Sequence, residues 1–531
     1  MKGFAVRMRI TTIVPLLVVA AGACVSLWVI PGRPETIERY QTIDRRPRIQ
    51  PDYTDAVIPP NIAPLNFLVR EPGAAYSIRI SVARGDPIEI FSRKPAIRIR
   101  PRSWRALLER NRGQEMQIDV SVKAKDGHWN RFQTITNRIA NEDIDRFLVY
   151  RKMHPTHLRV KGRIDIEVRD LTGFRKSVLL SSDSSENGCI NCHAFAGNRS
   201  DRMLMGVRSP RYGVGTLLVD GPTVRQIDAK FGYTSWHPSG QLAVYSVNNL
   251  PMFYHSSRNE VRDTVDLASF LACYFNDSQS IAVEPNLARK EHLENWPAWS
   301  GDGKHLYFCS SPVLWPRDTP SPPLLYDQVK YSLMRISYDV DTGRWGRLET
   351  VLSYEDTGKS IAMVRCSPDG RWLSFCMCDY GYFPAWQASS DLYLMDLTAR
   401  EEDGRFPYRR LEISSDTSES WQTWSSNSRW IVFSSKRLHG VFTRLFISYV
   451  DCDGTVHKPF VLPQKDPAFY DSCLLTFNTA ELVTDRPATT GETLARVYRS
   501  PDKLAIEMPI TMATPKAGQP ASEAAWQAQR E

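Results

Sequence analysis

The sequence predicts an all-β protein, in which an N-terminal β-sandwich is followed by a β-propeller of about six blades and preceded by a single transmembrane helix. Three observations carry this prediction. The chain begins with one long uncharged segment, continues with short segments of alternating polarity, and then repeats one unit four times. These patterns are typical of a membrane-spanning helix, of half-buried strands and of stacked repeats, respectively.

Residues 1–30 predict a cytoplasmic tip and a membrane anchor. Residues 10–30 carry no charge, and at about 1.5 Å per residue they span a hydrocarbon core of about 30 Å. Lys2, Arg7 and Arg9 precede this segment, and because positive charge stays on the cytoplasmic side, we expect a single-pass inner-membrane protein whose bulk lies in the periplasm. A cleaved signal peptide and a lipoprotein signal are the alternatives, and both also imply export.

Three segments flank or precede the repeats. Residues 31–60 combine many prolines and charges with few apolar residues, which predicts a Pro-rich tether. Residues 61–170 contain alternating segments such as YSIRISV and RIDIEVRDL, which predict the antiparallel strands of a β-sandwich, with a short helix or loop at residues 103–111. Residues 501–531 are mostly small and polar and predict a disordered tail.

Residues 202–500 contain the repeated unit. Each copy opens with an aromatic residue or a cysteine, continues with a polar turn such as SGDG, and ends in an apolar strand such as KHLYFC. The turn residues join two strands into a hairpin. Four-stranded blades arranged around an axis bury the faces of such units and protect their edges. Four clear copies and two degraded ones predict about six blades. The clear copies begin at Trp236, Trp299, Cys366 and Trp424.

Residues 171–201 hold the one motif that carries chemistry, a C-x-x-C-H pattern at Cys189, Cys192 and His193. In an exported protein this pattern indicates one covalently attached haem c, because the two thiols can add to two vinyl groups of one porphyrin and the histidine then binds the iron. A thioredoxin-like redox pair requires a βαβ context, whereas the flanks look all-β. A structural zinc site requires four ligands, and the sequence has no second CxxC.

The sixth iron ligand stays open at this stage. A methionine would raise the reduction potential relative to a second histidine, and an open position would allow ligand binding. We rank His255 first because it lies in an insertion, where propellers often place functional groups. His237, Met203 and Met205 rank lower, because turn closure explains the histidine and core packing explains the methionines.

Several segments together resemble one family of exported haem c proteins with a TolB-like propeller. They include GCINCHAF, SWHPSGQLAVYSVN, WPAWSGDGKHLYFCSS and KPFVLPQKDPAFYD. Members occur in bacteria of the Bacteroides and planctomycete kind and are often labelled cytochrome c biosynthesis or TolB-like proteins. The resemblance covers residues 60–490 and implies a TolB-like, WD-type propeller, a haem and export, but no reaction.

The function expected from these features is that of a membrane-anchored periplasmic c-type cytochrome. Its single haem would transfer electrons, alone or as the redox subunit of a multi-subunit complex, and the propeller would dock a redox partner protein. The alternatives are a haem-containing scaffold, binding or sensor protein, and a haem-dependent oxidoreductase with its active site at the propeller centre, so whether the chain is an enzyme is left open. A net charge of only +8 without a long basic block gives nucleic-acid binding no support.

Overall fold

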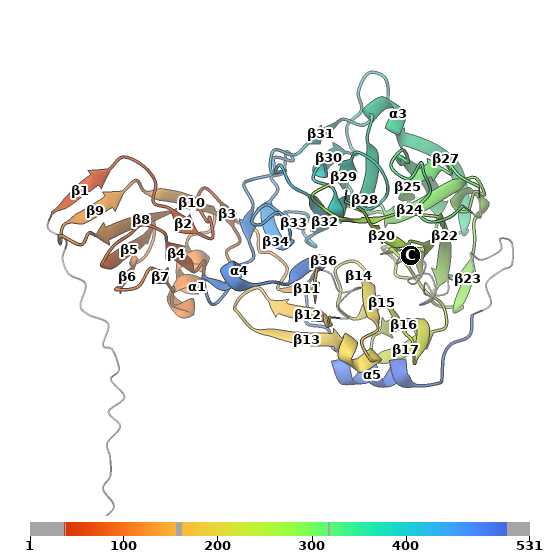
Figure 1. Cartoon of the computed structure of the whole chain (residues 1–531), viewed down its shortest axis with the longest axis horizontal. Coiled ribbons are helices and arrows are strands. Elements are labelled where there is room, and N and C mark those ends of the chain that lie inside the picture. The colour runs from red at the N-terminus through yellow and green to blue at the C-terminus, as the bar shows by residue number, and fades with distance from the viewer. Residues whose placement is uncertain (1–36, 38, 156–161, 257, 317–318, 507–531) are drawn as a thin grey trace, which may run out of the picture.

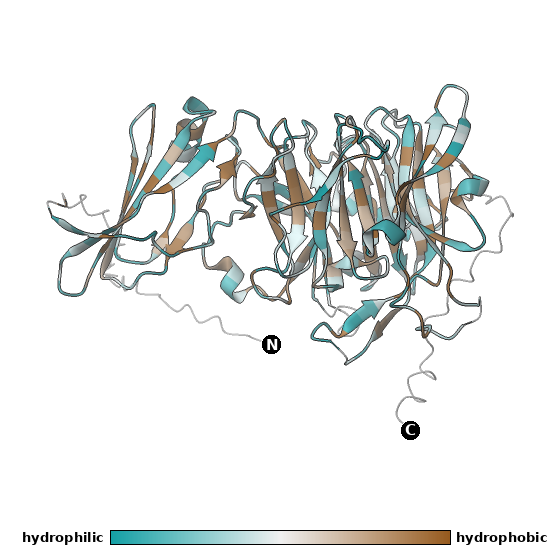
Figure 2. Cartoon of the chain, turned by 90° about the horizontal axis from the view of Figure 1, so that it is seen from above, coloured by the Kyte–Doolittle hydropathy of each residue, from teal (hydrophilic) through white to brown (hydrophobic). Residues whose placement is uncertain are grey.

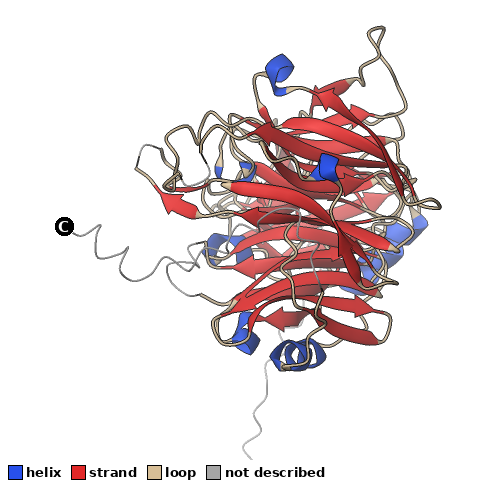
Figure 3. Ribbon diagram, turned by 90° about the vertical axis from the view of Figure 1, so that its right-hand side faces the viewer, coloured by secondary structure: helices blue, strands red, loops and turns tan. Residues whose placement is uncertain are grey.

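The computed structural model describes residues 37–506 except 38, 156–161, 257 and 317–318. The predicted membrane anchor, the first part of the tether and most of the predicted tail lie outside the described residues. No helix within the described ranges is long and apolar enough to cross a membrane. The described chain is mostly β, as predicted (Figure 3). Its sheets are almost entirely antiparallel, with β1 (Tyr40–Ile43) and β9 (Trp129–Phe132), and β3 (Val57–Ile58) and β10 (Ile135–Ile139), as the parallel pairs among the named strands.

The N-terminal unit contains two sheets, where the sequence predicted a β-sandwich. The tether predicted for residues 31–60 is wrong for its described part, which supplies strands to both sheets and buries Tyr53, Val57 and Ile58 in the core. The larger sheet has seven strands: β1 (Tyr40–Ile43), β3 (Val57–Ile58), β5 (Ala75–Val82), β6 (Ile88–Ser92), β8 (Glu115–Lys123), β9 (Trp129–Phe132) and β10 (Ile135–Ile139). The smaller sheet has three: β2 (Ile49–Gln50), β4 (Phe67–Val69) and β7 (Ala96–Ile97).

Local sequence explains these elements. Along β8 every second residue from Met116 to Val122 is buried, so one face of the strand packs in the core. The predicted short helix is α1 (Pro101–Arg110), which begins with a proline at its first position, where no backbone donor is lost. It buries Trp104, whose indole nitrogen donates to the Ile62 carbonyl at 3.0 Å.

The rest of the chain forms six four-stranded antiparallel sheets. Three of them are β13 (Lys176–Ser181), β12 (Ile164–Asp170), β11 (Phe147–Met153) and β36 (Thr476–Val483); β14 (Cys189–Phe195), β15 (Arg202–Ser209), β16 (Gly213–Asp220) and β17 (Thr223–Ile227); and β18 (Thr234–Trp236), β19 (Leu242–Asn249), β22 (Ala268–Phe275) and β23 (Ser280–Ala282).

The other three sheets follow in chain order. They are β24 (His292–Trp299), β25 (His305–Pro312), β26 (Ser332–Asp339) and β27 (Arg344–Leu352); β28 (Ser360–Cys366), β29 (Trp372–Cys378), β30 (Asp391–Asp396) and β31 (Tyr408–Arg410); and β32 (Glu419–Trp424), β33 (Trp430–Ser435), β34 (Arg444–Tyr449) and β35 (Phe460–Val461). Figure 1 shows the six sheets around a common centre, an arrangement consistent with a β-propeller. The strand nearest the centre in each sheet packs against that of the next, and β36 packs against β14.

The sheets divide the chain differently from the sequence-based boundaries. Strands β11 and β12 fall in the segment predicted as the end of the β-sandwich, but they pair with β13 and with the C-terminal strand β36. The predicted haem segment, residues 171–201, is not a separate junction, because it supplies β13 to one sheet and β14 to the next. The pairing of β11 with β36 joins residues more than 300 positions apart, such as Arg151 and Asn478. No local sequence pattern could therefore predict it.

The repeated turns owe their regularity to side-chain hydrogen bonds. The Ser300 hydroxyl donates to Asp302 at 2.6 Å and accepts from the backbone nitrogen of His305 at 3.0 Å. The same serine bond occurs in the turns that begin at Ser367 and Ser425. Such bonds hold a tight turn between two strands and explain why these residue types recur.

The N-terminal unit docks on the sheet formed by β32 to β35 (Figure 1). Figure 2 shows this unit from above, at one side of the remaining sheets. The backbone nitrogen of Ser426 donates to Asp145 at 2.7 Å, and Tyr449 donates to Glu142 at 2.7 Å. The indole of Trp430 donates to the Glu142 carbonyl at 3.3 Å. The two parts of the chain therefore share a polar interface beside a continuous apolar core.

Candidate functional site

The C-x-x-C-H motif lies on β14, the strand of its sheet nearest the centre of the ring. Cys189, Ile190 and Asn191 pair regularly with β15, but the register shifts between Asn191 and Ala194, so that Cys192 and His193 form a two-residue bulge. Bulges re-aim side chains away from the regular alternation of a strand. The motif thus places its histidine at the point where β14 departs from its ladder.

The same bulge recurs in the central strands of other sheets. Register shifts occur at the equivalent places of β24, β28, β32 and the β11–β36 pair. The first residue of each of these bulges has left-handed backbone angles, with φ between 51° and 55°: Trp296, Met363, Trp421 and Thr479. The bulge is therefore a property of the repeated fold, and the motif occupies a position that every such sheet already provides.

His193 is buried and lacks any hydrogen-bond partner at either ring nitrogen. Burial, helped by the charge of Arg151, lowers the pKa of His193 to about 3. The backbones of Val149 and Thr479 oppose this shift, although neither reaches hydrogen-bond geometry with the ring. A neutral imidazole buried without a partner is unusual, because no hydrogen bond compensates for the desolvation of its nitrogens. The neutral form is also the one that binds metals.

The structure describes all of Cys189 but only the backbone of Cys192. The thiol of Cys189 is free and half-buried. The backbone of Cys192 belongs to β14, whereas its side chain lies outside the described part of the chain. Cys189 precedes Ile190, whose side chain packs in the core shared with β11 and β36. Because neighbours on a strand face opposite ways, Cys189 projects to the other face of the sheet.

Two arginines, Arg151 and Arg365, lie close enough to the buried imidazole to affect its charge. Arg151 donates to Asn478 at 2.9 Å and also to Asn191 within the motif. Arg365 on β28 pairs with Glu481 on β36 at 3.0 Å. Burial raises the pKa of Glu481, and the charge of Arg365 opposes that rise. Both arginines also disfavour a charged His193, so the site is arranged to keep this ring neutral.

Two of the four candidate distal ligands are engaged elsewhere. His255 pairs with Asp263 at 3.6 Å on a hairpin inserted between β19 and β22. Both ring nitrogens of His237 are used, one with the Ser239 hydroxyl at 2.7 Å and the other with the Gly303 carbonyl at 3.0 Å. His237 closes the first repeated turn, as its position in the repeat suggested.

The other two candidates, Met203 and Met205, are buried in the core between β14's sheet and its neighbour. Met205 lies opposite the bulge, because Asn191 pairs with Gly206 and Ala194 pairs with Leu204. Its strand is hydrogen-bonded to β14, and paired strands lie only about 4.8 Å apart. Met205 is therefore a core residue on the strand that pairs with the motif.

The sequence predicted an insertion around His255, but not that this insertion forms a hairpin. We name residues 250–266 the strap; it contains β20 (Met252–Tyr254) and β21 (Arg262–Thr264). It reaches loops of three other sheets: Arg262 donates to the Pro155 carbonyl, Glu260 accepts from Lys436 at 2.7 Å, and Thr264 bonds Tyr382 at 2.8 Å. The strap therefore crosses the ring at one end. The long spacing between the first two repeats was the only signal of an insertion there.

A second buried group lies where the strap rejoins β22. Asp266 accepts hydrogen bonds at one oxygen from Ser269, Asn295 and Tyr331, at 2.5 to 2.8 Å, while its other oxygen has no partner. Burial raises the pKa of Asp266 to about 6, and the three donors oppose the rise. The Asp266 carboxyl group is therefore expected to titrate near pH 6.

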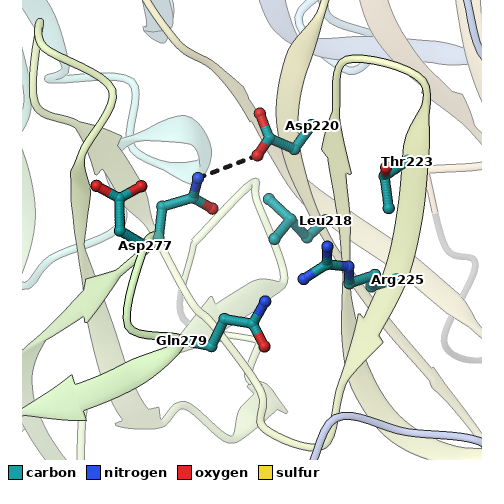
Figure 4. Close-up of a pocket in the computed structure, with 7 residues that line it drawn as sticks. Leu218, Asp220, Thr223, Arg225, Asp277 and Gln279 are labelled. Atoms are coloured by element: carbon teal, nitrogen blue, oxygen red, sulfur yellow. Dashed lines mark hydrogen bonds between the residues drawn. The ribbon is translucent and has the colours of Figure 1, made fainter.

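A shallow surface pocket of about 130 Å³ contains none of the residues predicted from the sequence (Figure 4). It lies at the ends of β16, β17 and β22, where Asn276 donates to Asp220 at 3.1 Å. Its lining is Leu218, Asp220, Thr223, Arg225, Asn276, Asp277 and Gln279. It is small and polar, unlike the large apolar cavities that hold most cofactors.

The residues of the motif meet the requirements of a haem c site only in part. The unpartnered, neutral imidazole of His193 fits an axial iron ligand. The backbone conformation does not fit, because Cys189 and Cys192 are three residues apart in an extended strand. Extended residues three apart are separated by about 10 Å along the strand, and the first thiol lies on the face opposite Ile190.

Comparison with known proteins identifies no family and no function for this chain. No protein-family model matches the chain, and no curated protein matches it. Solved structures of β-propeller proteins are similar to it. Luciferin-regenerating enzyme is 10% identical, with a TM-score of 0.33 over 60% of this chain and 96% of its own. Puromycin hydrolase is 15% identical, with a TM-score of 0.32 over 60% of this chain and 45% of its own.

A further similar structure is the hydrazine synthase of Kuenenia stuttgartiensis, which is 10% identical, with a TM-score of 0.31 over 63% of this chain and 76% of its own. At these identities and TM-scores the similarity carries no argument about this chain. The chain spans less than half the length of puromycin hydrolase. None of these proteins carries an argument about the activity of this one.

Proposed function

We propose that the chain is a c-type cytochrome that carries one haem on Cys189, Cys192 and His193 and transfers single electrons. The observation that carries the proposal is the state of His193, which is 2% exposed, neutral and without a partner at either nitrogen, within a C-x-x-C-H sequence. Haem c supplies one-electron redox chemistry when bound. A histidine that served only the fold would be expected to make the hydrogen bonds its burial requires.

The surroundings of His193 suit an electron carrier. The arginines nearby, Arg151 and Arg365, add positive charge to a buried site. Positive charge in a low dielectric stabilises the more reduced state of a redox centre and so raises its potential. Burial also keeps water from the ring, which reduces the reorganisation that accompanies a change of charge. These residues would tune the centre rather than bind a substrate.

The wider assignment belongs to the same proposal. The six sheets form a TolB-like propeller, the N-terminal segment anchors the chain in the inner membrane, and the propeller faces the periplasm, where it docks a redox partner or a larger complex. The repeated turns and the six four-stranded sheets support the first part. The second part rests on the uncharged segment and the basic residues before it.

A scaffold role is the second candidate, and one observation favours it. The ring of His193 on β14 lies against the backbones of Val149 on β11 and Thr479 on β36, so it stands at the seam where the C-terminal strand closes the ring of sheets. A group bound there would join the two sides of the seam. The role would then be to stabilise closure rather than to carry electrons.

The experiment that tests the proposal starts with the full chain co-expressed with a haem-attachment system. Covalent haem should survive denaturation in SDS and stain for peroxidase activity, and Cys189→Ser with Cys192→Ser should abolish the stain. A reversible one-electron titration with retained fold supports electron transfer. A haem that cannot be reduced reversibly, together with a large loss of thermal stability in its absence, favours the scaffold role. An unstained wild-type chain contradicts both.

A further inference from the structure

The hairpin of β16 and β17 presents four side chains to the neighbouring sheet. Leu218 pairs with Arg225, and Asp220 pairs with Thr223, in the antiparallel ladder of this hairpin. Residues that pair across a ladder, and residues two apart on one strand, point to the same face of a sheet. Leu218 packs in the apolar core between this sheet and the sheet of β18, β19, β22 and β23. All four side chains therefore face that next sheet.

The next sheet supplies the opposite wall of a surface pocket. Tyr274 on β22 packs in the same core, and Asn276, two residues later, points to the same side. The turn after β22 adds Asp277 and Gln279. The Asn276 amide donates to Asp220 at 3.1 Å and joins the two walls (Figure 4). The pocket of about 130 Å³ thus lies where the apolar core between two sheets ends in polar side chains.

Arg225 brings to this pocket a positive charge that the described chain leaves unpaired. Asp220 already pairs with Arg202 at 2.7 Å and accepts from Asn276. Among the described residues, no carboxylate lies within 4 Å of the Arg225 guanidinium. Figure 4 shows this guanidinium directed into the pocket. Its parallel N–H groups match a carboxylate, which accepts two hydrogen bonds from one guanidinium.

Asp277 brings an unpaired negative charge to the pocket. Its side chain is exposed, and no cation lies within 4 Å of it in the part of the chain that the structure describes. Asp277 and Arg225 lie on opposite sides of the lining, with Leu218 between them (Figure 4). A ligand that complements both must therefore accept hydrogen bonds at one end and donate them at the other.

Tyr274 provides a second, independent observation. Its phenol oxygen is buried and has no hydrogen-bond partner among the described residues. Burial raises the pKa of Tyr274 to about 12, while the charge of Arg225 opposes that rise and the charge of Asp220 adds to it. The phenol therefore lies close to two residues of the pocket. A buried hydroxyl without a partner indicates that a ligand or a water supplies the missing hydrogen bond.

We propose that this pocket binds a small carboxylate that carries a hydrogen-bond donor on its α-carbon, namely an α-amino acid or an α-hydroxy acid. Arg225 binds the carboxylate at two points, the Tyr274 hydroxyl donates to it, and Asp277 accepts a hydrogen bond from the α-ammonium or α-hydroxyl group. Because a water molecule occupies about 30 Å³, a volume of about 130 Å³ admits only small members such as alanine and lactate. The inference is independent of the proposed electron transfer.

Calorimetric titration of the purified full chain tests the pocket with three probes, L-alanine, L-lactate and propionate. One site per chain is expected for alanine, lactate or both, and propionate, which lacks the α-donor, should bind at least about fivefold more weakly. Arg225→Met should weaken binding of the better probe at least about tenfold, because the charged pair is lost. Arg347→Met is the matched control and should change nothing, because Arg347 is exposed on β27, the outermost strand of another sheet.

Two tyrosines of the same core provide a further comparison. Tyr274→Phe should weaken binding about fivefold, and Tyr245→Phe should leave it unchanged. The Tyr245 hydroxyl is also buried without a partner, and its ring stacks on Phe231, but no residue of the pocket affects its charge. A general loosening of the core would alter both variants alike, so a difference between them assigns the effect to the pocket.

The ranking of the probes identifies the source of the carboxylate. Tighter binding of alanine, with a preference that is lost in Asp277→Asn, assigns an α-amino acid, because only an ammonium group carries a charge for Asp277 to pair. Tighter binding of lactate assigns an α-hydroxy acid. The inference is overturned if no probe binds up to about 50 mM, which would leave the pocket to water. It is also overturned if Arg225→Met keeps the affinity, or if propionate binds as tightly as the other two probes.

Discussion

His193 and Gln422 occupy the same place in their sheets, the second position of the bulge on the strand nearest the centre. The Gln422 amide donates to the Met363 carbonyl, which belongs to the bulge of the preceding sheet. His193 lies against Thr479, the corresponding bulge residue of its own preceding sheet, and makes no hydrogen bond. One position in the repeated fold thus holds a satisfied amide in one sheet and an unsatisfied imidazole in another.

This equivalence predicts that His193→Gln folds normally. The new amide can donate to the Thr479 carbonyl as Gln422 donates to that of Met363, so the free energy of unfolding of the haem-free chain should stay equal or rise by about 1 kcal/mol. Urea denaturation measures it. Gln422→His is the matched control and should lose about 1 kcal/mol. A loss above about 2 kcal/mol for His193→Gln would show that the imidazole itself serves the fold.

The strap should depend on the ion pair between Glu260 and Lys436. Lys436 is 5% exposed, and burial lowers its pKa, with Glu260 opposing that shift. Glu260→Gln leaves this ammonium buried without its carboxylate, which should cost about 3 kcal/mol. Adding Lys436→Met to the same chain should restore only part of the loss, because the buried Arg262 also loses its carboxylate partner. Urea denaturation and amide exchange in residues 250–266 measure both effects; unchanged exchange in Glu260→Gln would contradict a latching role.

The pKa of Glu260 predicts how far the pH can fall before the strap loses the stabilisation from this ion pair. Burial would raise the pKa of Glu260, but hydrogen bonds from Arg262 and the charge of Lys436 outweigh it and lower the pKa to about 2. Because the folded-state pKa is below the ordinary value of 4.5, the stabilisation is complete above about pH 4.5 and is lost as the pH falls through about 2. Amide hydrogen exchange in residues 250–266 should therefore stay slow at pH 5. Rapid exchange at pH 5 would contradict this prediction.

Asp266 predicts a pH dependence of the opposite sign. Its pKa is raised from 3.8 to about 6 by burial. The folded chain then binds more protons than the unfolded chain in that interval, so stability falls as the pH rises from about 4 to 6 and is level above. The fall should be about 3 kcal/mol at most. Asp266→Asn keeps an acceptor for Tyr331 and should remove this slope in urea denaturation; a slope that persists would assign it elsewhere.

The pair between Arg365 and Glu481 should matter to ring closure. Glu481 lies on β36, is 8% exposed, and has Arg365 as its ion-pair partner at 3.0 Å. Arg365→Met leaves a buried carboxylate unpaired, which should cost about 3 kcal/mol or more. Arg405 pairs on the surface with Asp403, so Arg405→Met is a matched control expected to change stability by less than about 1 kcal/mol. Equal effects of the two variants in thermal unfolding would refute the role of the buried pair.

The sequence predicted those parts of the fold that local chemistry determines. The turns at Ser300 and Ser367 were visible because one serine and one aspartate, two residues apart, form the turn by themselves. The closure of the ring was not visible, because the pairing of β11 with β36 depends on residues such as Arg151 and Asn478, which no sequence window contains together.

The candidate site was also predicted only in those features that depend on local sequence. The motif on Cys189, Cys192 and His193 is a local spacing, so the sequence predicted it. His193 is buried beside the backbones of Val149 and Thr479, which belong to two other strands, so its burial could not be predicted from the motif. The strap was missed because its contacts are ion pairs and hydrogen bonds to three distant loops, which leave no periodic pattern along residues 250–266.

The most direct test of the account is the haem content of the purified full chain after co-expression with a haem-attachment system. The alkaline pyridine spectrum should show one thioether-linked haem per chain, and His193→Gln should keep the fold but shift the iron spectrum through loss of its ligand. A folded wild-type chain with no covalent haem, or a haem whose spectrum is identical in His193→Gln, would contradict the central claim.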